Sequence, residues 1–402
     1  MILVYKNRMT KSAIPQWAVF AYSLLATEFA WLWLPLQMTI AYILVLVGAL
    51  NTGIGKFALA VLAVSWLGLI YNIFNAFKAR GIVQKALNIS LGIKFLEKLT
   101  PTQRNRINQK ISFKDWALPF NFKRKNVEVI RDIPYGSHGV RQMLDVYRPT
   151  NIPPEGCPVL LQIHGGAWMI GNKEHQALPL LNLMASKGWI CISINYRLSP
   201  SIGFPTHLED CKRALNWIKT SGVEYGIDPN FISVTGGSAG GHLAALMGLT
   251  ANYADLQHEF PELDTQLQAC VPLYGVYDVL VRKTPNKQKM MINFLKNRVI
   301  HQTPEQAPEL WDLASPICHI KEQAPPFMII QGGIDSLTAV KGAQEFQSLL
   351  AEKSKNEVVY VELPGAEHAF DNFHSPRTEA VINGIHQFLE YCYAKHKKES
   401  MQ

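Results

Sequence analysis

The sequence predicts a protein of the α/β class. We expect a mostly parallel, eight-stranded sheet with helices on both faces, preceded by N-terminal helices that are apolar enough to cross a membrane. Two observations lead to this prediction. Residues 12–77 contain only two charged residues, whereas from residue 127 onward short apolar runs alternate with helical patterns. Apolar runs joined by helices are typical of parallel strands that are buried on both faces.

The elements after residue 127 can be placed from these runs. Strands are expected where about four to eight apolar or β-branched residues lie between turn residues, and helices where apolar residues recur at helical spacing. The expected strands are 127–132, 143–148, 159–163, 190–194, 231–235, 269–273, 327–331 and 358–362. The expected helices lie near 174–187, 205–221, 238–250, 339–353 and 377–395.

An N-terminal membrane anchor is expected over residues 1–77. The uncharged residues 57–77 are long enough to cross the hydrocarbon core of a bilayer, and residues 30–50 form a second candidate span. A tight turn at 51–56 would join the two spans as a hairpin. The shorter apolar stretch 13–27 is either an interfacial helix or a third span. A cleaved signal peptide is the competing interpretation, but no small-residue cleavage site follows a single short apolar region.

Charge is divided unequally along the chain. Residues 1–126 contain 16 Lys and Arg against 3 Asp and Glu, a net charge of +13, whereas residues 127–402 contain 23 against 28, a net charge of −5. The basic part alternates with apolar runs and has no nucleic-acid-binding motif, so a membrane surface is the expected partner and nucleic acid is not. Basic residues flank the apolar region on both sides. This favours an even number of spans and a cytoplasmic C-terminal domain, whereas three spans would place that domain on the other side.

The remaining chain divides into a connector, 78–126, and a domain, 127–402. Apolar residues recur at helical spacing in the basic connector, so its helix either lies along the membrane or packs on the domain. Within the domain, residues 279–315 contain methionines and aromatic residues among lysines. This segment is expected to be a lid over an apolar site, or else an ordinary amphipathic surface helix.

Ser238 is expected to be a catalytic nucleophile. It lies between Gly236 and Gly240 in the pattern G-x-S-x-G, at the end of an expected strand and the start of an expected helix. A serine hydroxyl is a weak nucleophile in water, so a hydrolase holds it exposed on a sharp turn beside a base. The pattern alone is short, but its position between a strand and a helix is the setting of a nucleophile elbow.

A second glycine-rich segment, His164-Gly-Gly-Ala-Trp168, follows the third expected strand and is expected to form an oxyanion hole. Acyl transfer builds negative charge on the carbonyl oxygen, which backbone N–H groups can stabilise. In the α/β-hydrolase arrangement one donor is the N–H group after the nucleophile, here that of Ala239. The other donors are expected from the glycine-rich segment: Gly165, Gly166 and Ala167. His164 itself is expected to fix the loop rather than to act as a base.

A general base and an acid should follow later in the chain, in the order Ser, Asp or Glu, His. His368 and Asp335 each lie just past an expected strand, at the sheet edge where Ser238 is expected. We therefore predict Ser238 as nucleophile, His368 as base and then acid, and Asp335 as the group that orients the imidazole. Asp278 is the rival acid.

No cofactor and no metal are expected. The sequence contains no phosphate-binding loop, no dinucleotide-binding fingerprint and no cluster with metal-ligand spacing. Its six cysteines are scattered without a C-x-x-C pair, so we expect buried free thiols and a reducing compartment.

The ordered motifs resemble those of the hormone-sensitive-lipase-like branch of the α/β-hydrolases over about residues 127–395. The matching motifs are His164-Gly-Gly-Ala-Trp168, Asn195-Tyr-Arg-Leu-Ser-Pro200, Gly236-Gly-Ser-Ala-Gly-Gly241, Gly333-Ile-Asp335 and Glu367-His368. The resemblance implies an α/β-hydrolase fold and a carboxylic-ester hydrolase. Membrane-attached relatives with arylacetamide deacetylase-like and isoprenylcysteine methylesterase-like activity make an N-terminal anchor compatible with it. The chain departs from the family's His-Gly-Gly-Gly loop at Ala167, which keeps a backbone N–H group but is expected to narrow the acyl pocket.

Together these observations predict a membrane-anchored serine carboxylesterase or lipase that hydrolyses apolar esters through an acyl-enzyme. An amidase, a deacetylase or a prenylcysteine methylesterase could use the same three residues. A third alternative is a catalytically inactive ligand-binding relative, since the gibberellin receptor resembles this family but has lost its base. The intact set of Ser238, Asp335 and His368 argues against that alternative. The oligomeric state and the natural ester are not indicated.

Overall fold

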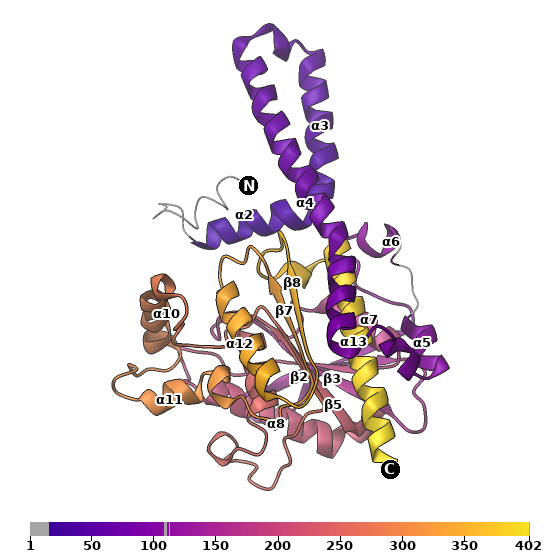
Figure 1. The fold of residues 1–402 in the computed structure, drawn as a ribbon, viewed down its shortest axis with the longest axis vertical. Coiled ribbons are helices and arrows are strands. Elements are labelled where there is room, and N and C mark those ends of the chain that lie inside the picture. The colour runs from indigo at the N-terminus through magenta and orange to yellow at the C-terminus, as the bar shows by residue number, and fades with distance from the viewer. Residues whose placement is uncertain (1–15, 108–110, 112, 402) are drawn as a thin grey trace.

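The computed structural model describes residues 16–107, 111 and 113–401, and its described part contains one eight-stranded sheet in the order β1-β2-β4-β3-β5-β6-β7-β8 (Figure 1). β2 runs antiparallel to both of its neighbours, and the strands from β4 to β8 are parallel to one another. The strands are β1 (Val127–Pro134), β2 (Met143–Pro149), β3 (Cys157–Ile163), β4 (Ile190–Ile194), β5 (Ile227–Gly237), β6 (Ala269–Leu273), β7 (Phe327–Gly332) and β8 (Val358–Leu363). The predicted mostly parallel sheet of eight strands is confirmed.

Helices cover both faces of the sheet, because alternate residues of a buried strand point to opposite sides. In β3, for example, Val159 and Leu161 belong to one hydrophobic cluster and Leu160 belongs to the other. The first cluster contains side chains of α8 (Thr206–Ser221), α9 (Ala239–Leu249) and α12 (Val340–Lys353). The second cluster contains side chains of α4 (Gly53–Leu91), α7 (Leu178–Ser186) and α13 (Pro376–Ser400).

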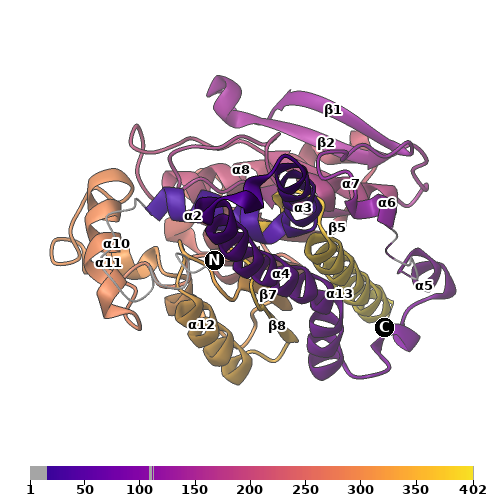
Figure 2. The same cartoon turned by 90° about the horizontal axis from the view of Figure 1, so that it is seen from above.

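The N-terminal helices are α2 (Gln16–Glu28), α3 (Ala30–Leu46) and α4. α3 and the first half of α4 form a hairpin that projects from the rounded sheet domain (Figure 1). α2 lies across the base of this hairpin, on top of the domain (Figures 1 and 2). α2 and α3 are bent by 84° relative to each other.

The second half of α4 packs on the sheet domain. Val83, Leu87 and Leu91 are buried in the second cluster, together with side chains of α13. The Ser90 hydroxyl donates a hydrogen bond of 2.9 Å to the carbonyl oxygen of Val358 in β8. α4 crosses the boundary expected at residue 77 without a break. Of the two alternatives for the connector helix, this part of it therefore packs on the domain. The short helices α5 (Pro101–Ile107) and α6 (Phe113–Trp116) come after it.

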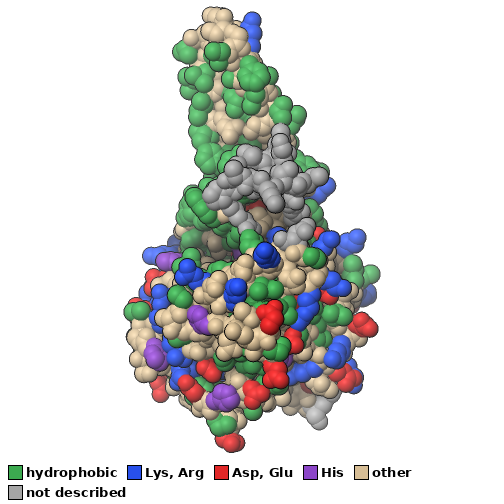
Figure 3. All heavy atoms as spheres, turned by 90° about the vertical axis from the view of Figure 1, so that its left-hand side faces the viewer, with side chains coloured by type: hydrophobic (Ala, Val, Ile, Leu, Met, Phe, Trp, Pro, Cys, Tyr) green, Lys and Arg blue, Asp and Glu red, His purple; other side chains and the backbone are tan. Residues whose placement is uncertain are grey.

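The projecting hairpin exposes hydrophobic side chains. Leu46, Phe57 and Leu67 are 66%, 72% and 69% exposed. Figure 3 shows a mostly hydrophobic column above a domain whose surface carries charged side chains of both signs. By length and composition α4 could cross a membrane, and only 17% of its most apolar window of 18 residues is buried inside the protein, unlike the core helix of a soluble protein. α2 and α3 are long and apolar enough to cross a membrane only when the two helices are taken together as one bent span.

The segment expected to be a lid, 279–315, contains α10 (Pro285–Arg298) and α11 (Pro308–Leu313). Leu295 and Trp311 are buried in the first hydrophobic cluster, whereas Met290 is half exposed. Both helices lie at the periphery of the domain (Figure 2). Part of the apolar composition of this segment is thus used for packing on the domain, and its function as a lid stays a prediction.

The cysteines are free thiols. Five of them are buried: Cys157, Cys191, Cys211, Cys270 and Cys392. The expectation of burial is wrong for Cys318, which is exposed because it lies in a short turn between α11 and β7 rather than in a strand or a packed helix.

Candidate active site

Ser238 lies at the junction of β5 and α9, where the backbone is strained. It has φ 59° and ψ −121°, a conformation that residues with a side chain rarely adopt. The turn is so tight that a Cβ atom on Gly240 would lie 2.0 Å from the carbonyl oxygen of Ile163. Only glycine fits at that position, and the chain therefore makes a sharp strand-to-helix turn at the predicted nucleophile.

Asp335 and His368 follow β7 and β8, whose carboxyl ends lie at the same edge of the parallel sheet as the end of β5. The Nδ1 atom of His368 lies 2.8 Å from Oδ2 of Asp335. Because an ionised carboxylate can only accept hydrogen bonds, Nδ1 carries the proton and Nε2 has a free lone pair. A general base needs this tautomer.

Asp335, Glu367 and Asp371 all lie near His368. The directions of their pKa shifts indicate which of them is suited to pair with the imidazole. Burial acts to raise the pKa of Asp335, but the charge and hydrogen bond of His368 and the hydrogen bonds from Thr338 outweigh it, so the pKa lies below its ordinary value. Burial raises the pKa of Glu367 and that of Asp371. Asp335 is therefore the carboxylate best suited to stabilise a protonated imidazole.

Tyr274 connects the imidazole with the elbow. Its ring centroid lies 4.5 Å from that of His368, and its hydroxyl donates a hydrogen bond to Asp371. A Cβ atom on Gly237, the residue before Ser238, would lie 2.6 Å from the Tyr274 hydroxyl oxygen. The His368 ring and the turn that carries Ser238 thus share Tyr274 as a neighbour.

The rival acid, Asp278, has partners of its own. Its carboxylate accepts hydrogen bonds from the backbone N–H groups of Leu280 and Arg282, and the Arg282 guanidinium lies 2.9 Å away. These contacts lie within the loop after β6 and are typical of a structural ion pair.

The predicted oxyanion-hole residues lie where the loop after β3 approaches the elbow. A Cβ atom on Gly165 would lie 3.1 Å from Cβ of Ser238 and 3.2 Å from Oε1 of Gln176. The Gly165 N–H donates a hydrogen bond of 2.6 Å to this amide oxygen. The other predicted donors have N–H groups without an acceptor among the described residues: Gly166, Ala167 and Ala239. Gln176 therefore engages one of the four predicted donors beside Ser238, a contact that the sequence does not reveal.

Ala167, which stands in place of a third glycine in this loop, and Trp168 both have a strained backbone. Their φ angles are 53° and 60°, in the left-handed region that glycine adopts freely. A non-glycine residue in this region costs roughly 1–2 kcal/mol. Trp168 is 4% exposed and donates a hydrogen bond of 3.2 Å to His242, so this part of the loop is fixed in the core.

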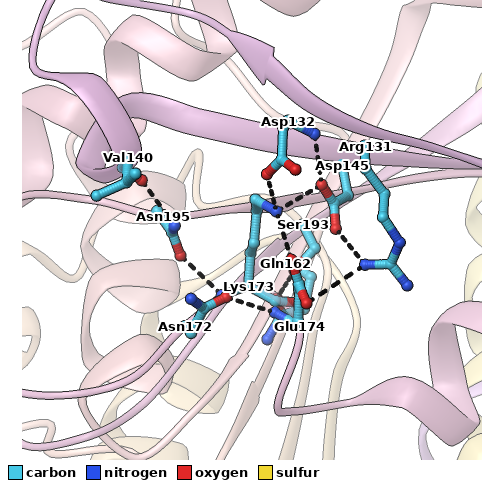
Figure 4. A network of polar contacts seen from close by, with 10 residues as sticks. All are labelled: Arg131, Asp132, Val140, Asp145, Gln162, Asn172, Lys173, Glu174, Ser193 and Asn195. Atoms are coloured by element: carbon cyan, nitrogen blue, oxygen red, sulfur yellow. Dashed lines mark hydrogen bonds and ion pairs between the residues drawn. The ribbon is translucent and has the colours of Figure 1, made fainter.

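The far end of the same loop is held by an ion network centred on the buried side chains of Lys173 and Asp145 (Figure 4). The Lys173 ammonium lies 2.8 Å from Asp132, 2.6 Å from Asp145 and 3.1 Å from Glu174. These three carboxylates are close enough together to hold a metal ion, but the ammonium supplies the positive charge at this place. The Lys173 backbone N–H also donates to the Asn195 side chain at 2.7 Å. The network therefore fixes the loop that carries the predicted oxyanion hole.

His164 has the structural function expected for it. Its Nδ1 lies 2.7 Å from the carbonyl oxygen of Gly165, and Tyr196 stacks on its ring at a centroid distance of 4.3 Å. The Tyr196 hydroxyl donates a hydrogen bond of 2.9 Å to the His164 carbonyl oxygen. Burial lowers the pKa of His164 to about 4, so the ring is neutral near pH 7. Tyr196 belongs to the motif 195–200, which thus serves to position the glycine-rich loop.

Known proteins that are similar to this chain in sequence are named as ester hydrolases. A family model described as BD-FAE matches residues 144–350. The probable carboxylic ester hydrolase LipM of Mycobacterium tuberculosis is 46% identical over 264 residues, which cover 65% of this chain and 61% of LipM. Esterase LipQ of the same organism is 42% identical over 265 residues, covering 66% of this chain and 62% of LipQ. The chain thus spans less than two thirds of the length of these relatives.

Among solved structures, an inhibited esterase B from Lactobacillus rhamnosis matches with a TM-score of 0.58 at 21% identity, covering 74% of this chain and 94% of that chain. This likeness shows the fold, in agreement with the predicted α/β-hydrolase architecture.

The two candidate acids can be separated by mutation. We expect Asp335→Asn to lower kcat for a short p-nitrophenyl ester by a factor of about 10³ to 10⁴, because the imidazole loses the group that fixes its tautomer. The matched variant Asp278→Asn should lose far less activity, because Asp278 pairs with Arg282 and not with an imidazole. Initial rates and thermal unfolding would be measured for both. A large loss confined to Asp278→Asn would overturn the choice of Asp335.

A substitution of Gln176 tests whether its amide oxygen occupies the Gly165 N–H as an oxyanion-hole donor. Gln176→Ala releases the Gly165 N–H, so we expect kcat/KM for the same ester to rise by about fivefold, the equivalent of one ordinary hydrogen bond of about 1 kcal/mol. Gln176→Glu should lower kcat/KM because it places a carboxylate beside the developing oxyanion. A loss of activity in Gln176→Ala would show instead that the amide is needed to hold the loop.

Proposed function

Because the chain belongs to the BD-FAE family and has the α/β-hydrolase fold, we propose that it is a membrane-anchored serine carboxylesterase or lipase acting on apolar esters. One observation carries the proposal. A serine on a strained turn, an imidazole paired with an ionised carboxylate, and unpaired backbone N–H groups all lie at one edge of the parallel sheet.

In the proposed reaction the Ser238 oxygen attacks the ester carbonyl carbon, and its proton passes to Nε2 of His368. The negative charge that develops on the carbonyl oxygen is accepted by N–H groups of the glycine-rich loop and of Ala239. Collapse of the tetrahedral intermediate breaks the ester bond, and His368 gives its proton to the departing alcohol. Water, activated by His368 in turn, then hydrolyses the acyl-enzyme. Asp335 keeps the imidazole oriented during both the formation and the hydrolysis of the acyl-enzyme.

A pocket beside the acid supports an apolar acyl chain. It lies between α10, α12 and the loop after β6, and Val276, Met291 and Leu337 are among the residues that line it. Thr338 also lines it, and the N–H groups of Leu337 and Thr338 donate hydrogen bonds to Asp335 at 2.9 and 2.7 Å. The pocket thus adjoins the turn that holds Asp335, and its apolar wall supports the predicted substrate class.

The hairpin of α3 and α4 supports the proposed anchor. Residues 57–77 of α4 extend about 32 Å at 1.5 Å per residue, close to the hydrocarbon core of about 30 Å. α2 packs on the domain rather than beside the hairpin, which supports two spans rather than three. With two spans, the basic flanks of the hairpin favour a catalytic domain on the cytoplasmic side.

The nucleophile can be tested directly. We expect Ser238→Ala to lower hydrolysis of short p-nitrophenyl esters by a factor on the order of 10⁴ or more, because no other group can form the acyl-enzyme. A fluorophosphonate probe should label the wild type but not this variant. Ser354→Ala, a change in the turn after α12, serves as the control and should keep full activity. Retention of most activity in folded Ser238→Ala would remove the mechanism.

Topology can be tested with introduced thiols. In a Cys318→Ser background the remaining native cysteines are buried. Asn51→Cys places a thiol at the tip of the hairpin, and Ser400→Cys places one at the end of α13. On intact cells, a membrane-impermeant maleimide should label Asn51→Cys, and it should label Ser400→Cys only after permeabilisation. Labelling of Ser400→Cys on intact cells would place the domain on the outer side.

A further inference from the structure

One face of α2 contacts the candidate catalytic histidine. The Phe20 ring lies edge-on to the imidazole of His368, with a centroid distance of 6.0 Å and an interplanar angle of 76°. Tyr274 contacts the same imidazole, and His368 is only 3% exposed. The helix that precedes the hairpin is therefore part of the wall around this residue.

Buried polar contacts hold α2 in this position. Glu28, at the end of α2, forms an ion pair with Arg377 of α13, and both side chains are fully buried. The Ser375 hydroxyl donates a further hydrogen bond of 2.9 Å to Glu28. Breaking a buried ion pair leaves an uncompensated charge, which is strongly destabilising. Ser23, midway along α2, is also fully buried.

The opposite face of α2 is exposed and apolar. Trp17, Tyr22 and Leu25 are 70%, 56% and 42% exposed. α2 has no charged residue except the buried Glu28, and it leads directly into the apolar hairpin. Aromatic residues on a helix that lies flat beside membrane spans are typical of the bilayer interface. The outer face of α2 therefore continues the apolar surface of the hairpin.

We propose that α2 lies in the membrane interface with its outer face on lipid, while Phe20 on its inner face bounds the path by which the ester reaches Ser238. The substrate class is accordingly an ester that resides in the bilayer and is taken up from it, rather than one that diffuses in from water. This inference rests on the proposed hydrolase function and adds the route of the substrate and the residue that shapes it.

The wall is tested by Phe20→Ala in the full-length protein, reconstituted in phosphatidylcholine vesicles. Two substrates are compared: p-nitrophenyl acetate in the aqueous phase and a long-chain fluorogenic ester incorporated in the vesicles. We expect kcat/KM for the vesicle-borne ester to change by about tenfold or more, as for a lost apolar contact in a substrate site. The acetate should be affected far less. Phe57→Ala, on the exposed part of the hairpin, is the matched control and should behave as the wild type.

Equal behaviour of Phe20→Ala and the wild type on both substrates would overturn the inference but leave the proposed function intact. Failure of the wild type to hydrolyse either ester would instead refute the proposed function. Phe20→Leu keeps an apolar side chain and provides a second variant if Phe20→Ala does not fold. A selective effect on the vesicle-borne ester in Phe20→Leu would support the wall, and wild-type rates of this variant on both esters would overturn it.

The membrane contact is tested separately. Tyr22→Cys in the Cys318→Ser background would be labelled with an environment-sensitive nitrobenzoxadiazole dye, with Ser400→Cys as the control. We expect a blue-shifted emission for the label at position 22 in vesicles and a water-like emission at position 400. A water-like spectrum at both positions would overturn the placement of α2 in the interface.

Discussion

The hydrogen bond between the Asp335 carboxylate and the His368 imidazole is the interaction on which the rest of the candidate site depends. Both residues are almost completely buried, and a buried carboxylate is costly unless it is well hydrogen-bonded. The side chain of Gln331 and the backbone and hydroxyl of Thr338 provide such bonds, and Leu337 adds a backbone N–H. All three donor residues come from the end of β7 and the turn after it. This short turn therefore keeps the carboxylate ionised where the imidazole needs it.

The same burial determines how the site is enclosed. Charge interactions are stronger where water is excluded, so the ion pair that forms during catalysis gains from every group that covers His368. Tyr274 covers the imidazole from the loop after β6, and Phe20 covers it from α2. α2, which lies outside the sheet, thus helps to exclude water from the imidazole of His368. The N-terminal helices and the candidate site are therefore one structural unit rather than two modules joined by a linker.

The sequence predicted the parts of the site that follow strong local patterns. Ser238, Asp335 and His368 each come directly after a recognisable strand, and parallel strands bring their carboxyl ends to one edge. Gln176 and Phe20 could not be predicted, because a side-chain contact between distant segments leaves no periodic signal in either segment. Residues 83–91 illustrate a related limit. Their apolar positions indicate a helix with one apolar face, but lipid and protein are equally apolar partners for that face.

Glu28 shows what a single charge can determine in an otherwise apolar region. In the sequence it only marks the end of an apolar stretch, and in the structure α2 ends there and the chain bends into α3. A carboxylate at this place would face either lipid or the domain, and lipid is the costlier alternative. Its pairing with Arg377, 349 residues later in the chain, therefore orients the bend toward the domain. Since the pair is fully buried between α2 and α13, it fixes the hairpin and the sheet edge in one relative orientation, with Phe20 against His368.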